Sequence, residues 1–263
     1  MRKYGIISIP VVPVRIADSE KFEMTTQLLF GEMIEILEIR DRWTFIRNLN
    51  DNYTGWISAK MYTPLDEALY QRILSLKRVC LTRPYSIIYN TYSNESMMIP
   101  GGSYIYNPEG DDFELGDQKW SLIEPFSLPN INVEAFRIPQ LAAQFLNSPY
   151  LWGGKSIMGI DCSGLTQIAF AMGGYQIPRD ASQQVDSGFV VDFLTEALPG
   201  DLAFFEDGEG RIVHVGILID SSRIIHASGK VRIDIIDSQG IKQTVHGDYT
   251  HKLRIIKRII SQK

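Results

Sequence analysis

Polar and apolar positions alternate with a period near two through the first part of the chain, as in half-buried strands. Residues 31–39 alternate acidic and apolar side chains, and short β-branched or aromatic runs at 11–16, 43–47 and 55–57 are separated by polar turns. Several short strands divided by such turns are typical of a small β-barrel. The pattern therefore predicts a barrel domain at residues 1–66.

A second β-rich region follows the first. A short helix or a linker is expected within 61–76, where a proline and acidic residues are typical of a helix start. Residues 78–128 contain short apolar runs punctuated by proline and glycine. The turn and tryptophan at 116–123 are similar to those at 41–46, so we interpret residues 67–130 as a degenerate second copy of the barrel.

The periodicity changes in the C-terminal part of the chain. Pro139 suits the first turn of a helix and is followed by an apolar stripe, and a second helix is expected from Cys162 to Met172, ended by two glycines. Strands are then expected at 211–220, 223–228 and 253–260. Helices ahead of a run of strands predict an α+β domain at residues 131–263.

Composition excludes several classes of protein. The chain has 263 residues with a net charge of −5, and nucleic-acid-binding surfaces are normally basic. No apolar run reaches the ~20 residues that a membrane-spanning helix needs. The two cysteines and four histidines provide neither a disulfide framework nor a usual zinc spacing. His246 and His251 stand near predicted loops and are expected at the surface.

Cys162 is the leading candidate for chemistry. It stands at the predicted start of a helix, where unpaired amides and the helix dipole are expected to lower the pKa of its thiol. Asp161 would raise that pKa, unless it caps the helix or binds a substrate amine. Cys80 lacks such a setting and is expected in the core.

A nucleophilic cysteine needs a base, and two histidines stand in adjacent predicted strands. If residues 220–222 form a three-residue hairpin loop, Gly216 lies opposite His226, and His214 lies two residues further on the same face. His226 would then orient His214, which is the general logic of covalent acyl transfer. A two-residue loop would place the histidines on opposite faces.

These residues also carry a resemblance to a known family. The C-terminal part resembles the NlpC/P60 cysteine peptidases of bacterial cell walls, and the N-terminal part resembles bacterial SH3-type modules. The matching C-terminal segments are Pro149–Gly154, Asp161–Leu165, Pro199–Leu202, His214–Ile217 and Ile225–Ala227, and the matching N-terminal ones are Gly31-Glu32, Trp43 and Gly55-Trp56. The arrangement is most similar to the γ-D-glutamyl-L-diamino acid endopeptidases, or dipeptidyl-peptidases VI.

The resemblance implies a papain-like α+β catalytic domain preceded by two small SH3-type β-barrels. It implies Cys162 as the nucleophile, His214 as the general base, His226 as the residue that orients it, and Tyr150 as a donor near the oxyanion. It implies hydrolysis of the bond between γ-D-glutamate and diaminopimelate in peptidoglycan stem peptides. No metal or other cofactor is expected, and we expect a monomer.

In the dipeptidyl-peptidase VI subgroup, the first SH3-type module closes one end of the cleft, and the substrate keeps a free N-terminal L-Ala. The expected ligand is therefore L-Ala-γ-D-Glu-diaminopimelate, with a carboxylate and hydroxyl groups around its ammonium. The resemblance carries this substrate-binding role to Glu23, Tyr53, Trp152, Asp161, Ser163 and Asp180.

Two alternatives remain open at this point. Related folds act as amidases or acyltransferases, and a papain-like domain that has lost activity could serve as a cell-wall binding module. The intact set of Cys162, His214 and His226 favours the peptidase. The short apolar run at the N-terminus does not form a signal peptide, so we expect a cytoplasmic protein that recycles peptides, or one outside the cytoplasm if a leader has been trimmed.

Overall fold

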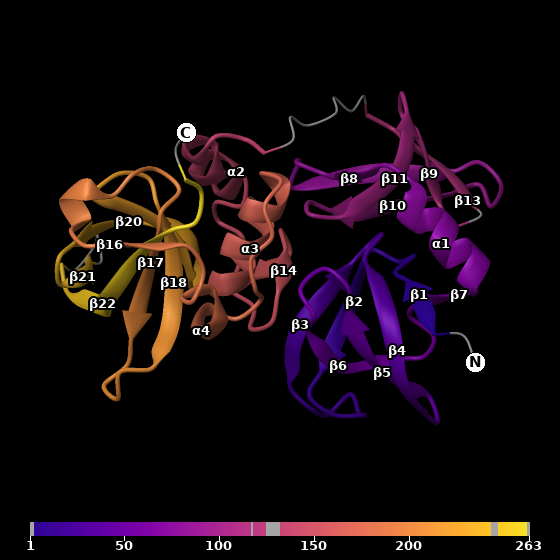
Figure 1. Cartoon of the computed structure of the whole chain (residues 1–263), viewed down its shortest axis with the longest axis horizontal. Coiled ribbons are helices and arrows are strands. Elements are labelled where there is room, and N and C mark those ends of the chain that lie inside the picture. Colours follow the sequence, from indigo (N-terminus) through magenta and orange to yellow (C-terminus); the bar gives the residue numbers. More distant parts are fainter. Residues whose placement is uncertain (1–2, 117, 125–131, 243–246, 262–263) are drawn as a thin grey trace. The chain divides into compact units, whose positions relative to one another are not determined.

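The computed structural model describes residues 3–116, 118–124, 132–242 and 247–261. Within them the chain divides into two compact units, Met1–Pro129 and Asn130–Lys263 (Figure 1). Antiparallel sheets dominate both units, and most of the helical residues belong to the second.

The first sheet of the N-terminal unit confirms the expected β region. Its antiparallel strands lie in the order β3-β2-β6-β5-β4-β1-β7. Their bounds are β1 Tyr4–Ile6, β2 Val11–Arg15, β3 Met24–Leu29, β4 Met33–Arg40, β5 Trp43–Asn48, β6 Thr54–Ser58 and β7 Thr63–Leu65. Aliphatic side chains from β2, β3 and β5 form its core, among them Val12, Leu28 and Ile46, none of which is exposed.

The strand β4 departs from the simple alternation that predicted it. A bulge between Ile36 and Glu38 shifts its register against β5. Beyond this point Leu37 and Ile39 are 39% and 50% exposed, so the apolar side chains no longer face the core. The acidic and apolar alternation located the strand correctly, but the half-burial that it predicts fails beyond the bulge, where all four residues from 37 to 40 are exposed.

A helix and a second sheet follow. The helix α1, Glu67–Ser75, begins where expected, since the Asp66 side chain accepts a hydrogen bond from the Leu69 amide at 2.8 Å. The second sheet has the strand order β10-β9-β13-β12-β11-β8. Its strands are β8 Arg78–Cys80, β9 Tyr85–Asn90, β10 Glu95–Pro100, β11 Tyr104–Glu109, β12 Asp112–Leu115 and β13 Gln118–Leu122.

The two sheets of this unit share one hydrophobic core. Phe30 of the first module packs edge-on against Trp120 of the second, with ring centroids 6.1 Å apart. The Tyr104 amide donates to the Phe30 carbonyl at 2.9 Å, and the Tyr106 hydroxyl donates to the Gly31 carbonyl at 2.8 Å. Gly31 has φ +81°, and a Cβ there would lie 1.9 Å from the Tyr104 oxygen, so only glycine fits this junction.

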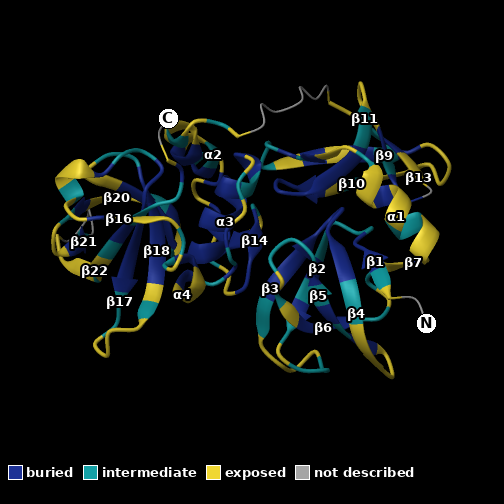
Figure 2. Cartoon of the chain, viewed as in Figure 1, coloured by how far each residue is buried: buried dark blue, intermediate teal, exposed yellow. Residues whose placement is uncertain are grey.

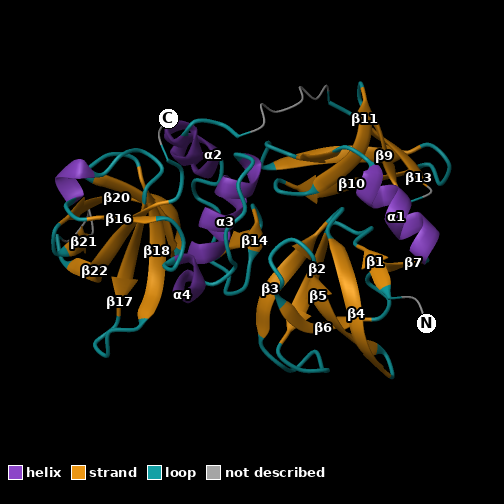
Figure 3. Ribbon diagram, viewed as in Figure 1, coloured by secondary structure: helices purple, strands orange, loops and turns teal. Residues whose placement is uncertain are grey.

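The C-terminal unit combines short helices with a larger sheet (Figure 3). Its helices are η1 Ala135–Arg137, α2 Ile138–Ala143, α3 Cys162–Met172, α4 Ala181–Gln184 and η2 Leu194–Glu196. Its strands are β14 Lys155–Ser156, β15 Gly159–Ile160, β16 Phe189–Val191, β17 Leu202–Glu206, β18 Ile212–Leu218, β19 Arg223–Ser228, β20 Lys230–Asp237, β21 Gly240–Lys242 and β22 Tyr249–Arg258. The helices at 138 and 162 and the strands at 212, 223 and 249 were expected, whereas β17, β20 and β21 were not.

The large sheet of this unit closes on itself. Its order is β16-β22-β17-β18-β19-β20-β21, and β21 also pairs with β22, so the strands from β17 to β22 form a ring. Apolar side chains including Phe205, Leu218 and Ile236 form a core cluster from several of these strands. The helix α3 packs against β18 and β19. Figure 2 shows α3 and most of β18 as buried. Among the described residues, no helix has the length and apolar character needed to cross a bilayer.

Candidate active site

Cys162 is the first residue of α3, as the sequence predicted. The preceding Asp161 has extended backbone angles, and its side chain accepts a hydrogen bond from the Gly164 amide at 2.6 Å, so it caps the helix. Every residue of α3 except Ala171 is buried, and Cys162 itself is 7% exposed. The thiol is therefore held on a rigid element at the unpaired amide end of a helix.

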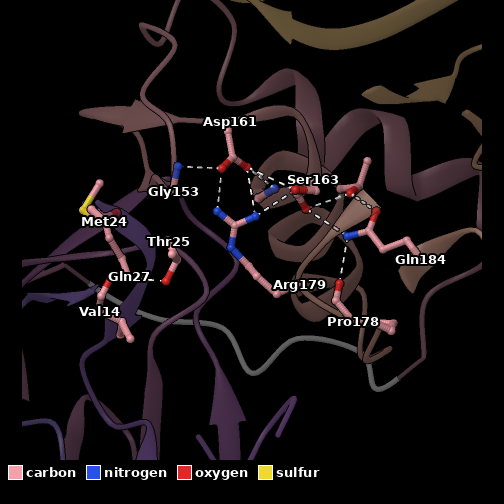
Figure 4. A network of polar contacts seen from close by, with 12 residues as sticks. Val14, Met24, Thr25, Gln27, Gly153, Asp161, Ser163, Pro178, Arg179 and Gln184 are labelled. Carbon is pink, nitrogen blue, oxygen red and sulfur yellow. Dashed lines mark hydrogen bonds and ion pairs between the residues drawn. The ribbon is translucent and has the colours of Figure 1, made fainter. Parts of the chain in front are cut away.

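Asp161 is the centre of a buried polar network (Figure 4). Arg179 donates to its two carboxylate oxygens at 3.0 and 2.6 Å, and the Gly153 amide donates to it at 2.8 Å. Arg179 also donates to the Ser163 hydroxyl at 2.8 Å, and its side chain is 1% exposed. Asp161 and Ser163, both expected to bind substrate, thus also tie the helix start to two loops of the same unit.

The pKa of the Cys162 thiol contradicts the expectation from the helix start. Burial, followed by the charge of Asp161, raises this pKa to about 11. The backbone amides of Val215 and Ser163 hydrogen-bond to the sulfur and, with the Arg179 charge, act in the opposite direction. Desolvation outweighs the helix amides, so the resting thiol is neutral and must lose its proton during attack.

The histidine pair confirms the predicted hairpin register. Ile217 pairs with Ile225, and the Ile219 amide donates to the Arg223 carbonyl at 2.9 Å, which is the register of a three-residue loop. Nε2 of His214 lies 2.9 Å from Nδ1 of His226, and both rings are buried.

Gly216 lies beside this contact, on the same face of β18 as His214. A Cβ at Gly216 would approach the His226 Cβ to 2.9 Å, so only glycine leaves room for the pair. The Val215 amide that reaches the Cys162 sulfur directly follows His214, so the strand that carries this histidine also contacts the cysteine.

A buried carboxylate that the sequence analysis missed continues this chain. Oδ2 of Asp234 lies 3.1 Å from Nε2 of His226, and Asp234 is 4% exposed. Arg232 donates to its Oδ1 at 2.8 Å. The sequence signal for this contact is Gly229, whose φ of +70° suits the turn between β19 and β20. The pairing of these two strands places Asp234 on the same face as His226.

His251 is not the surface residue that was expected. Its ring stacks on that of His214 with centroids 4.1 Å apart, because the closed sheet brings β22 to this end of the ring. Burial, then the neighbouring His251 and His226, lowers the pKa of His214 well below its usual value. Burial and His226 lower the pKa of His251 to about 4. His246 lies outside the described residues.

Tyr150, Trp152 and Asp180 belong to loops of the same unit. The pKa of Tyr150 is raised, first by burial and then by the charge of Cys162, so its hydroxyl stays protonated close to the thiol. Trp152 is 60% exposed, as suits a wall of a cleft. Asp180 is half-buried and precedes α4, but its side chain makes no capping hydrogen bond.

Glu23 and Tyr53 belong to the N-terminal unit. Glu23 is exposed, directly before β3, and its carbonyl accepts from the Ile16 amide at 3.1 Å. Tyr53 is half-buried, directly before β6, and its amide donates to the Asp51 side chain at 3.0 Å. Their substrate-binding role stays a prediction, as do the catalytic roles assigned to the C-terminal residues.

The described residues contain no group of histidine, cysteine and acidic side chains arranged to hold a metal ion. A thiol, an imidazole with a hydrogen-bonded partner, and a protonated phenol are the groups that acyl transfer to sulfur requires.

Two known protein families match parts of the chain. Residues 147–250 match the NlpC/P60 family, and residues 17–60 match the bacterial dipeptidyl-peptidase SH3 domain. A protein of Bacillus subtilis named gamma-D-glutamyl-L-lysine dipeptidyl-peptidase is 29% identical over 90% of this chain and 81% of its own length. Dipeptidyl-peptidase 6 of Lysinibacillus sphaericus is 25% identical over 82% of this chain and 86% of its own length.

A solved structure shows the same fold. The crystal structure of an NlpC/P60 family protein from Bacillus cereus superposes with a TM-score of 0.82 at 20% identity, covering 98% of this chain and 100% of that one.

Proposed function

The chain belongs to the NlpC/P60 family of cell-wall cysteine peptidases and carries a bacterial dipeptidyl-peptidase SH3 domain, and on that basis we propose that it cleaves the bond between γ-D-glutamate and the following diamino acid in peptidoglycan-derived peptides. The observation that carries the proposal is that Cys162 begins α3, which packs against β18 and β19, the strands that carry the paired rings of His214 and His226. The relative from Bacillus subtilis is named for a bond of this type.

The reaction follows from the state of each group. The Cys162 sulfur attacks the γ-carbonyl of D-glutamate while its proton passes to His214, whose imidazole is neutral at rest because burial lowers its pKa. The backbone N–H groups at the start of α3 and the Tyr150 hydroxyl stabilise the oxyanion. His214 then protonates the leaving amine of the diamino acid, and it later takes a proton from the water that hydrolyses the thioester.

Replacing Cys162 with Ala tests the nucleophile. Turnover of L-Ala-γ-D-Glu-L-Lys and L-Ala-γ-D-Glu-diaminopimelate is expected to fall by at least about 10⁴-fold, because no other group at the start of α3 can form the thioester. Mass spectrometry of the released L-Ala-γ-D-Glu measures this. The matched control is Cys80→Ala, which removes the cysteine outside the site and should keep the wild-type rate. Retained hydrolysis by Cys162→Ala would contradict the proposal.

We further propose that the substrate needs a free N-terminal amine, which Glu23 and Tyr53 help to recognise. An ammonium group is bound well by a carboxylate and a hydroxyl, and acetylation removes both its charge and two donors. N-acetylated tripeptide should therefore be cleaved at least about 100-fold more slowly. Glu23→Gln should raise KM for the free peptide and reduce the difference in cleavage rate between the free and the acetylated peptide. Equal cleavage of the free and acetylated peptides would refute the requirement.

A further inference from the structure

The strand β20 breaks the usual pattern of apolar and polar positions. Ile233 and Ile235 are 41% and 48% exposed, while Asp234 between them is 4% exposed and shares its face with Ile236 of the core cluster. Burying a carboxylate costs several kcal/mol unless it is paired, and exposing two isoleucines adds no compensating burial. Departures from hydrophobic patterning of this kind concentrate at functional sites, which indicates that the buried orientation of Asp234 serves the chemistry of the site.

The contacts of Asp234 fix where the hydrogens lie. Arg232 donates to its Oδ1 at 2.8 Å and forms an ion pair with its Oδ2 at 2.7 Å, which keeps the carboxylate ionised. An ionised carboxylate is an acceptor only, so Nε2 of His226, 3.1 Å from Oδ2, must carry its hydrogen. In neutral His226 the other nitrogen, Nδ1, is then bare.

The hydrogen bond between the two histidines then fixes the tautomer of His214. A bare Nδ1 on His226 can only accept, so Nε2 of His214, 2.9 Å away, must be the donor. Neutral His214 then has its hydrogen on Nε2 and a lone pair on Nδ1. That lone pair is what a general base needs in order to take the thiol proton.

We propose that Asp234 is a positioning residue, which fixes the tautomer of His226 and through it presents the unprotonated Nδ1 of His214 to Cys162. The effect of Asp234 on catalysis rests on the proposed function, whereas the positions of the hydrogens can be tested without any substrate. Other groups face the same rings: His251 stacks on His214, and Arg232 holds Asp234 from its own strand. None of these sets the tautomer, because only Asp234 meets Nε2 of His226 among the contacts of the described residues.

The variant Asp234→Asn separates this role from simple packing. Asparagine keeps the shape of aspartate but is neutral and has one oxygen, so it cannot accept from Nη2 of Arg232 at one edge and from Nε2 of His226 at the other. With its oxygen on Nη2 of Arg232, its N–H₂ faces Nε2 of His226, which inverts the hydrogens of both rings and leaves His214 with a protonated Nδ1. We expect kcat to fall by about 10²–10⁴-fold with KM changed less than about threefold. The matched control Asp207→Asn, in the turn between β17 and β18, should keep the wild-type rate.

A double variant tests whether Asp234 acts through His226. In a His226→Gln background the tautomer no longer exists, so adding Asp234→Asn should cause no further loss of kcat. Losses that multiply in the double variant would mean that Asp234 acts only through packing, and would overturn the proposal.

Nitrogen-15 NMR of histidine-labelled protein tests the arrangement independently of turnover. In the wild type, His226 should be protonated at Nε2 and bare at Nδ1, and the reversed pattern should be partly or wholly present in Asp234→Asn. A wild-type His226 protonated at Nδ1 would overturn the proposal even if the variant does not fold. A wild-type protein that shows the expected tautomer but cleaves no peptide would contradict the proposed function and leave the role of Asp234 intact.

Discussion

Asp161 and Asp234 are both buried carboxylates paired with an arginine, yet they serve different ends of the site. Asp161 accepts hydrogen bonds from the backbone amides of Gly153 and Gly164 as well as from Arg179. These donors belong to the scaffold and keep their hydrogens throughout the reaction. Its carboxylate therefore fixes the shape of the backbone beneath the nucleophile.

The contacts of Asp234 lead instead to the two imidazoles on which the proposed mechanism depends. It meets His226, which meets His214, and both rings are buried. A carboxylate joined to fixed amides acts on geometry and stability, and one joined to an imidazole acts on where protons lie. The difference teaches that burial and pairing alone do not tell a structural ion pair from a catalytic one, whereas the identity of the remaining partner does.

The largest effect on stability should come from separating the first pair. Arg179→Met leaves the Asp161 carboxylate buried without its counter-charge, which costs about 3–5 kcal/mol of unfolding free energy. The same substitution at Arg232, whose side chain is 25% exposed, should cost no more than about 2 kcal/mol, because water can replace part of the contact. Urea denaturation followed by circular dichroism measures both. Equal losses would break the distinction between the two carboxylates.

The sequence was sufficient for the parts of the site that depend on neighbouring residues. The bounds of α3 and its Asp161 cap follow from local propensity, and the diagonal contact of His214 with His226 follows from the length of one hairpin loop. Such features need only short-range geometry.

The missed parts depend on long-range structure or on a local pattern that points the wrong way. Asp234 stands between two isoleucines, so hydrophobic patterning predicts that the isoleucines face the core and that the carboxylate faces water, the opposite of what is observed. His251 reaches His214 only because β22 pairs with both β17 and β21 and closes the ring, which no local signal reports. Burial also reversed the expected pKa direction for Cys162, since desolvation depends on what covers the thiol.

A smaller effect should be the pH dependence of stability, which we expect to come from the histidines near Asp234 and not from the Asp161 network. His251 has a pKa of about 4 in the folded protein, against about 6.5 for an unfolded chain. Between these values the unfolded state binds more protons, so the free energy of unfolding falls as the pH drops from about 6.5 towards 4. The buried His214 adds to this loss in the same direction. Acid sensitivity in this window is therefore expected to come from the histidine end of the site.

Thermal unfolding of the wild type and His251→Phe at several pH values between 7 and 4.5 tests this assignment. Phenylalanine keeps an aromatic ring against His214 but cannot bind a proton, so Tm should fall less steeply with acid in the variant, whatever its value at pH 7. Arg179→Met serves as the contrast: its loss of Tm should be largest at pH 7 and shrink as the pH falls, because protonation relieves a buried carboxylate that has lost its counter-charge. Parallel curves for the wild type and His251→Phe would show that the stacked ring does not titrate in this window, and the pH difference between the two carboxylate clusters would then rest on His214 alone.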